Sequence, residues 1–219
     1  AGLEIGVAAT KTLVSQILAM LLLSLYMAEL RGGLGSDRVR QYTEELRRIP
    51  AQLSDYLEDG AAAHVEDVAA RYASSSFFMC LGRDIGLPVA LEGALKLKEI
   101  SYIPTEAYPA GEMKHGPIAL LEDGSPVLVV ATDSHVYDKL VSNMQEVRAR
   151  GARVIAVASE GNESLAEMVD EVLYVPRTDE MLMPLIAVVP LQLFAYYVAK
   201  RRGEKVDQPR NLAKTVTVE

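Results

Sequence analysis

Three charged residues lie on one stripe of an otherwise apolar segment, residues 87–103. On a helix with about 100° per residue, Glu92, Lys96 and Glu99 fall within an arc of about 60°. Such a stripe has two interpretations. It is either a solvated face with salt bridges between neighbouring turns, or the wall of a cleft in which Lys96 tunes the carboxylates and Glu99 moves a proton.

A second candidate for proton transfer lies in residues 108–124, where glycine and proline residues predict a long loop. This loop holds His115, and an imidazole titrates near neutral pH, which suits an acid–base group. His64 and His135 lie in ordinary polar helical contexts, which indicate surface or capping roles. The three histidines and the single cysteine show no ligand spacing, so we expect no metal site.

A third candidate is Lys214, near the end of a tail, residues 206–219, that has no helical or clean strand pattern. One interpretation is a frayed terminus. However, Leu212, Val216 and Val218 are apolar, and a tail that docks through them would dehydrate Lys214 and lower its pKa. A lysine that forms a Schiff base needs such an environment.

The elements that must position these residues alternate between strands and helices. Continuous apolar runs rich in β-branched residues predict strands buried on both faces; they lie at 76–81, 127–131, 154–158 and 172–175. Helical patterns lie at 87–103, 136–150, 162–169 and 182–202. The alternation predicts an α/β fold, a doubly wound parallel sheet flanked by helices and preceded by long helices. Ligands of such sheets bind beyond the carboxyl ends of the strands.

Long helices are predicted before the sheet. Residues 8–31 are expected to form an apolar helix, and the run at 12–30 within it is about long enough for a membrane span. Polar residues interrupt the run, so we expect a helix buried by protein. A charged helix follows at 37–58, with Asp37 as its N-cap and an interruption at Pro50. A further helix runs through 61–72.

The amino-acid composition argues against some classes of binding partner and indicates a cellular setting. The net charge of −8 argues against nonspecific binding of nucleic acid, which requires a basic face. The only cysteine, Cys80, lies in an apolar run and excludes an intrachain disulfide, so we expect a buried thiol and a reducing, cytoplasmic setting. The chain begins with Ala1 rather than methionine, which suggests a fragment or a processed chain.

Four motifs carry a resemblance over essentially the whole chain. They are EIGVA at 4–8, ALEGALKLKEISY at 90–102, GEMKHGP at 111–117 and DQPRNLAKTVTVE at 207–219. With them the sequence resembles the glucosamine-6-phosphate synthase family, the glutamine–fructose-6-phosphate amidotransferases. The resemblance implies cytoplasmic homodimers of sugar-isomerase (SIS) domains that convert fructose 6-phosphate and glutamine-derived ammonia to glucosamine 6-phosphate. It implies neither a metal nor an organic cofactor.

The resemblance also implies roles for particular residues. Glu99 resembles the base that moves a proton between C1 and C2, and Lys96 resembles its helper. His115 resembles the histidine that opens the sugar ring and reaches the site of the neighbouring subunit. Lys214 resembles the tail lysine that engages the open-chain ketone.

Two further positions, Val7 and Ala213, match residues whose backbone lies near the sugar phosphate. The domain organisation expected from the resemblance is the end of a first SIS domain, a helical linker, a second SIS domain and an active-site tail; these span residues 1–34, 35–68, 69–205 and 206–219. The glutaminase domain and the bulk of the first SIS domain, with its phosphate loop, would be missing. The fragment alone is therefore expected to be inactive.

Three alternatives stay open at this point. The first is a deaminase or deglycase of amino-sugar phosphates on the same fold, against which the tail sequence argues. The second is a noncatalytic domain that binds sugar phosphates, which would need no base such as Glu99. The third is a membrane-anchored protein, based on the apolar residues 12–30.

Overall fold

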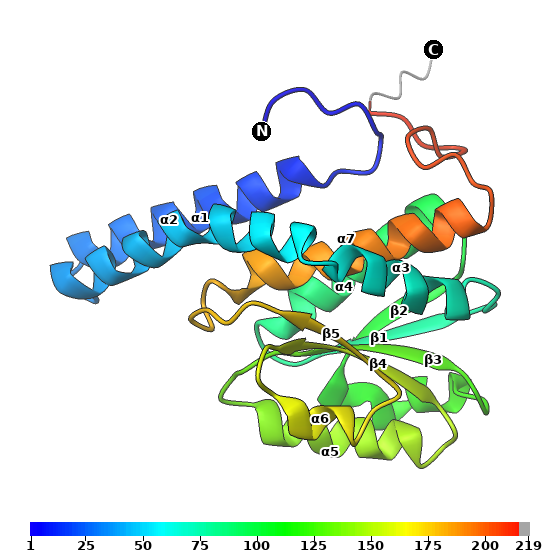
Figure 1. Ribbon diagram of the computed structural model, residues 1–219. Helices are drawn as coiled ribbons and strands as arrows, with labels where there is room; N and C mark the ends of the chain where they lie inside the picture. Colours follow the sequence, from blue (N-terminus) through cyan, green and yellow to red (C-terminus); the bar gives the residue numbers. More distant parts are fainter. Residues whose placement is uncertain (215–219) are drawn as a thin grey trace.

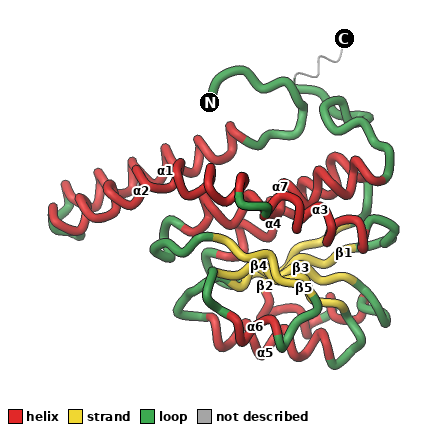
Figure 2. Tube along the Cα trace, viewed as in Figure 1, coloured by secondary structure: helices red, strands yellow, loops and turns green. Residues whose placement is uncertain are grey.

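The computed structural model describes residues 1–214. Within these residues the strands form one five-stranded, all-parallel sheet in the order β2-β1-β3-β4-β5 (Figures 1 and 2). The strands are β1 (Phe78–Gly82), β2 (Thr105–Pro109), β3 (Pro126–Ala131), β4 (Arg153–Ser159) and β5 (Glu171–Val175). The expected doubly wound α/β fold is confirmed.

Helices cover both faces of the sheet. On one face lie α3 (Ala61–Tyr72), α4 (Gly86–Ser101) and α7 (Met183–Arg201), and on the other α5 (Tyr137–Arg148) and the short α6 (Glu163–Ala166) (Figure 1). The side chains of β3 alternate between the two resulting cores: Leu128 and Val130 pack towards α4 and α7, and Val127 and Val129 towards α5. Buried strands of this kind read as continuous apolar runs, which is why the sequence revealed them.

The edge strand β2 escaped the sequence analysis, which assigned its last residues to a loop. Only Thr105 is buried, and the strand contains Glu106 and ends at Pro109. It pairs with β1 through the backbone, and an edge strand needs no apolar pattern for that. The remainder of the expected loop forms two 3₁₀ turns, Ala110–His115 and Pro117–Leu120.

Two long helices, α1 (Lys11–Leu30) and α2 (Ser36–Glu58), lie side by side and extend away from the sheet (Figure 1). The expectation for α2 was wrong in two details. Gly35 occupies the N-cap position, with Asp37 in the first turn, and the helix continues through Pro50. The helix keeps its course because Ile49 and Tyr56, on either side of the proline, are buried against the rest of the chain.

The expected burial of helix 8–31 is wrong for this chain. Of α1 only Leu25 is buried, and Met20, Leu23 and Tyr26 are more than half exposed. By length and composition, both α1 and α7 could cross a membrane. They differ in burial: most of the apolar stretch of α7 is buried in the core, but only 6% of the apolar stretch of α1 is buried. Composition alone does not distinguish a helix covered by protein from one covered by lipid.

Two local features fix the start and the end of α4. A Cβ on Gly82 would lie 2.3 Å from the backbone oxygen of Gly86, so the close approach of β1 to α4 requires glycine there. At the other end Tyr102 adopts the left-handed conformation, with φ of 59°, and terminates the helix. Cys80 is buried as expected, and burial raises its pKa to about 12.

Candidate active site

Helix α4 brings Glu92, Lys96 and Glu99 together as the sequence predicted. The Lys96 side chain is buried, with its Nζ 2.5 Å from Glu99 Oε2 and 3.4 Å from Glu92 Oε1. A solvated row of salt bridges would leave the lysine in water, so the structure favours the interpretation of a cleft wall. An ammonium buried this deeply is stabilised only by the two carboxylates beside it.

The two carboxylates have different surroundings. Burial raises the pKa of Glu92, and the Lys96 ammonium partly offsets this rise. Its Oε1 lies at ion-pair distance from Lys96 but outside hydrogen-bond geometry, so this buried oxygen has no hydrogen-bond partner among the described residues. Glu99 keeps 23% of its side chain exposed and holds the short bond to Lys96. Glu92 is thus the more deeply buried carboxylate of the pair, and Glu99 the one closer to solvent.

A pocket of about 310 Å³ opens beside Lys96. Its walls come from the N-terminal segment, from α4 and α7, and from the chain after α7; they are Leu3, Glu4, Ile5, Gly6, Ala8, Thr10, Lys11, Lys96, Ile100, Gln192, Tyr196, Val206 and Asp207. The Nε2 atom of Gln192 is buried without a hydrogen-bond partner among the described residues. Unpaired polar atoms are rare inside proteins. Here one belongs to Glu92 on α4, the helix that carries Lys96, and the other to Gln192 on α7, which packs against α4.

The two ends of the chain meet at this pocket. The amide N–H of Val7 donates to the carbonyl of Asp207 at 3.0 Å. The amide N–H of Arg210 donates to the Tyr102 hydroxyl at 2.7 Å. The guanidinium of Arg210 lies 4.1 Å from the centre of the Tyr102 ring. These contacts attach the segment after α7 both to the N-terminal segment and to the end of α4.

Sequence reasoning missed Glu4, which connects three parts of the site. Its Oε1 accepts from the Thr12 amide N–H at 3.0 Å, at the start of α1, where amide groups lack partners within the helix. Its Oε2 accepts from the Lys214 ammonium. The bonds to Lys214 and Thr12 lower the pKa of Glu4 to about 2. An acidic residue shortly before an apolar helix was the available signal.

The tail lysine is not placed as expected. A docked tail was expected to dehydrate Lys214, but in this chain Lys214 pairs with Glu4 and stays 42% exposed. Leu212 is 43% exposed, so it does not dock the tail. Val216 and Val218 lie outside the described residues. Glu4 nevertheless lines the same pocket as Lys96, so Lys214 lies at the rim of that pocket.

The other candidates lie apart from the pocket walls. The His115 side chain is 75% exposed, and its Nε2 lies 4.0 Å from Glu112. Neighbouring Lys114 bonds Glu146 of α5 at 2.6 Å, which ties this turn to the opposite face of the sheet. Val7 and the exposed Ala213 lie on the two segments that meet at the pocket, without lining it.

The remaining histidines differ in their surroundings. His64 Nε2 lies 2.9 Å from the carbonyl oxygen of Val172 in β5. His135 lies between two carboxylates, 3.1 Å from Asp84 and 2.9 Å from Glu180, in an exposed cluster. Sequence spacing did not reveal this group because the three residues lie in connections far apart along the chain. An exposed network of ion pairs accounts for the arrangement.

The parallel sheet, covered by helices on both faces and with a pocket beside α4, is that of an α/β domain. The model of the SIS domain family matches residues 74–200, and the chain belongs to that family. Over its whole length the chain is 52% identical to the glutamine–fructose-6-phosphate aminotransferase (isomerizing) of Gloeobacter violaceus and 51% identical to that of Thermus thermophilus. The chain spans 36% of the length of each of these relatives. The resemblance found in the sequence is thereby confirmed.

Solved structures agree with this assignment. The C-terminal domain of glucosamine-fructose-6-phosphate aminotransferase from Francisella tularensis superposes with a TM-score of 0.88 and 38% identity, over 94% of this chain and 58% of that one. Glucosamine-6-phosphate deaminase from Thermotoga maritima gives 0.64 and 26%, over 97% and 58%. Tagatose-6-phosphate ketose/aldose isomerase from Escherichia coli gives 0.60 and 19%, over 77% and 46%, which shows the fold alone.

Proposed function

We propose that this chain acts as the C-terminal isomerase part of a glutamine–fructose-6-phosphate aminotransferase. The proposed reaction converts fructose 6-phosphate and ammonia from glutamine to glucosamine 6-phosphate. Identity of 51–52% to such aminotransferases over the whole chain supports it. The observation that carries the proposal is the buried Lys96, bound to Glu99 beside a pocket that both ends of the chain enclose.

The geometry of α4 suits the isomerisation step. After ammonia has replaced the C2 carbonyl oxygen as an imine, the C1 proton must be removed and a proton delivered to C2. One carboxylate performs both transfers, and Glu99 is the proposed base because it is the less buried of the pair. The Lys96 ammonium fixes the Glu99 carboxylate by its 2.5 Å bond and supplies positive charge where the electron pair shifts.

Lys214 is proposed to engage the open-chain ketone. An ammonium is a poor nucleophile, and the Lys214 ammonium is bound to the Glu4 carboxylate. A Schiff base at Lys214 therefore requires this contact to open when the substrate enters. Val7 and Ala213, on the two segments that meet at the pocket, are proposed to bind the sugar phosphate through their backbones.

His115 is proposed to open the sugar ring in the site of a second subunit, because it is exposed and does not line the pocket of its own chain. This role requires a homodimer, and the exposed apolar face of α1 provides surface that protein must cover. Residues 1–34 are proposed to end a preceding SIS domain, 35–68 to link it to a second one at 69–205, and 206–219 to form the tail of the active site. A cytoplasmic location follows from the proposed reaction.

Substitution of Glu99 by glutamine in the complete aminotransferase tests the assignment. Glutamine keeps the shape and removes the base, so turnover should fall by about 10²–10⁴-fold while fructose 6-phosphate still binds. Exchange of the C1 hydrogen with deuterium oxide, followed by proton NMR, reports isomerisation separately from glutamine hydrolysis. Glu122→Gln, which changes an exposed carboxylate in a loop, is the matched control. A loss below tenfold at Glu99 would refute its role.

An amino-sugar-phosphate deaminase is the second candidate. The Thermotoga maritima deaminase shares the fold, but at 26% identity it is far more distant than the aminotransferases. The complete enzyme decides between them: a deaminase releases ammonia from glucosamine 6-phosphate and gains nothing from glutamine. A noncatalytic sugar-phosphate domain would retain binding and lose nothing when Glu99 is replaced.

A further inference from the structure

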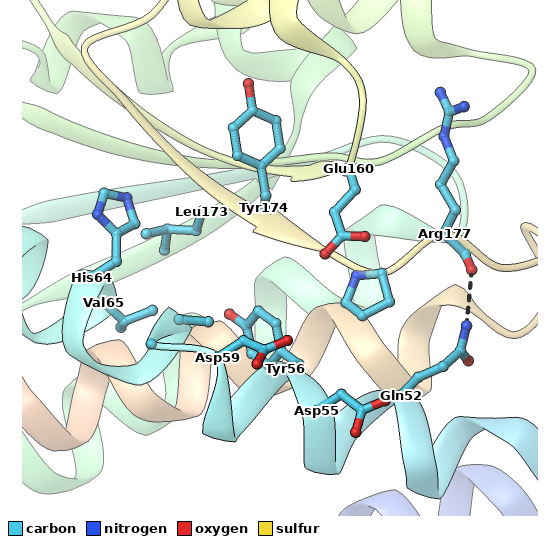
Figure 3. A pocket seen from close by; sticks show the side chains of 13 residues that line it. Gln52, Asp55, Tyr56, Asp59, His64, Val65, Glu160, Leu173, Tyr174 and Arg177 are labelled. Atoms are coloured by element: carbon cyan, nitrogen blue, oxygen red, sulfur yellow. Dashed lines mark hydrogen bonds between the residues drawn. The ribbon is translucent and has the colours of Figure 1, made fainter.

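A second cavity, of about 660 Å³, lies between α2, α3 and the carboxyl end of β5 (Figure 3). Its walls come from the two helices and from the segments that follow β4 and β5, and it shares no lining residue with the pocket beside Lys96. Small-molecule sites typically enclose about 300–1,000 Å³. The cavity is therefore large enough for a ligand of its own.

Contacts between the helices and the edge strand hold this cavity open. The Gln52 side-chain amide donates to the carbonyl of Arg177 at 3.3 Å (Figure 3). On α3, His64 Nε2 donates to the carbonyl of Val172 at 2.9 Å. Because these contacts fix both walls, a ligand would enter a cavity that already has its shape.

Tyr56 lines the cavity with an unpaired hydroxyl. The residue is only 6% exposed, and its hydroxyl makes no hydrogen bond with any of the described residues 1–214. Burial and the nearby Glu160 carboxylate raise its pKa to about 12, so the phenol keeps its proton at neutral pH. Such a hydroxyl is able to accept from an ammonium N–H or to donate to a ligand hydroxyl.

The charge around the cavity is negative. Asp55, Asp59 and Glu160 contribute three carboxylates, none of which forms an ion pair within residues 1–214. Arg177 is the one lining residue with a permanent positive charge, and its Nε lies 2.9 Å from Asp133, which offsets that charge. A cationic ligand is attracted to this site, whereas a sugar phosphate is repelled.

The spacing of the carboxylates decides between a metal ion and a larger cation. A metal site needs at least three ligand atoms close together. Among the described residues, Asp84, His135 and Glu180 form a group with ligand atoms within 4.8 Å of one another, and the carboxylates of the cavity form no such group. Their charge is thus spread over a distance that one ion does not span. Of the two aromatic residues of the lining, Tyr174 turns its side chain to the other face of the sheet, where its hydroxyl donates to the carbonyl of Asn162, so Tyr56 is the aromatic side chain on the α3 side.

We propose that the cavity between α2, α3 and β5 binds a small organic ammonium compound, either an aliphatic polyamine or an amino sugar without phosphate. The ammonium groups lie against Asp59 and Glu160, and the Tyr56 hydroxyl pairs with the ligand. The site is independent of the proposed aminotransferase reaction, since phosphorylated substrates do not fit its charge.

Calorimetric titration of the chain with spermidine, and separately with glucosamine, tests this proposal. Asp59→Asn and Glu160→Gln keep the side-chain shapes and should each weaken binding by about three- to tenfold. Tyr56→Phe removes one hydrogen bond and should weaken it by about fivefold. Glu44→Gln makes the same charge change at an exposed position of α2 outside the cavity, and should alter the affinity less than about twofold.

The outcomes separate the two sources of the ligand. Binding of spermidine that depends on Glu160 identifies a polyamine site, and binding of glucosamine with the same dependence identifies an amino-sugar site. The proposal is overturned if neither probe binds at millimolar concentration. It is also overturned if Glu44→Gln weakens binding as much as Glu160→Gln, because general surface charge would then explain the attraction. Circular dichroism confirms that each variant is folded before titration.

Discussion

Replacement of Lys96 by methionine tests whether the buried ion pairs of α4 hold the charge of the site. Methionine retains the apolar stem of lysine and removes only the ammonium. Lys96 is 4% exposed, while the side chains of Glu92 and Glu99 keep 14% and 23% of their surface in contact with solvent. The variant therefore leaves two partly buried carboxylates side by side without a counter-charge.

The expected cost follows from this burial. Removal of one partner of a fully buried ion pair destabilises a protein by about 3–5 kcal/mol. Since both carboxylates keep some contact with water, we expect Lys96→Met to lower the free energy of unfolding by about 2 to 3 kcal/mol. For a chain of this length the melting temperature should fall by about 4 to 12 °C.

The loss should grow with pH. Burial raises the pKa of Glu92 above its ordinary value of 4.5, so the folded state binds its proton more tightly than the unfolded chain. The stability from this proton is fully present below the unfolded pKa and is lost as pH rises through the folded pKa. The Lys96 ammonium lowers the folded-state pKa of Glu92. In the variant this folded-state pKa is therefore higher than in the wild type, and stability continues to fall to a higher pH. The difference between variant and wild type should widen as pH rises above the ordinary carboxyl pKa of 4.5.

Urea unfolding followed by circular dichroism across this pH range measures both effects. Lys98→Met, which makes the same change at the exposed neighbouring lysine, is the control and should cost less than about 0.5 kcal/mol. Adding Glu92→Gln to Lys96→Met removes one unpaired charge and should recover part of the loss. The reasoning fails if Lys96→Met costs no more than Lys98→Met, or if the double variant is the least stable of the set.

Three further predictions follow from the same structure. Gly82→Ala should cost about 3 kcal/mol or more in urea unfolding, because its Cβ would meet backbone atoms at the start of α4. Gly35→Ala, with open space around it, should cost no more than about 1 kcal/mol, the usual difference between these residues at an N-cap. Glu4→Gln should speed acylation of Lys214, measured by peptide mass spectrometry, and equal rates in both proteins would contradict the pairing. In the wild type the pair should survive acidification until pH falls towards the Glu4 pKa of about 2. Leu22→Glu on the exposed face of α1 should shift sedimentation from dimer towards monomer, and a wild type that is monomeric at micromolar concentration would count against the proposed homodimer.

Local periodicity accounts for what the sequence revealed about the site. Glu92, Lys96 and Glu99 share a face because residues separated by three or four positions are neighbours on any helix. Whether that face was solvated or formed a cleft wall depended on what packs against it. Here α7 and the N-terminal segment surround Lys96, and they come from distant parts of the chain.

The sequence by itself determined the class of fold, because buried parallel strands such as β3 and β4 must be apolar on both faces. It did not determine β2, which pairs through its backbone, nor the burial of α1, whose apolar face stays exposed in this chain. It also did not reveal that Glu4 binds Lys214 across 210 positions. Spacing along the chain specifies which residues share a helix face or a strand, but partners from distant segments meet only when the elements pack, and the tertiary structure alone decides which they are.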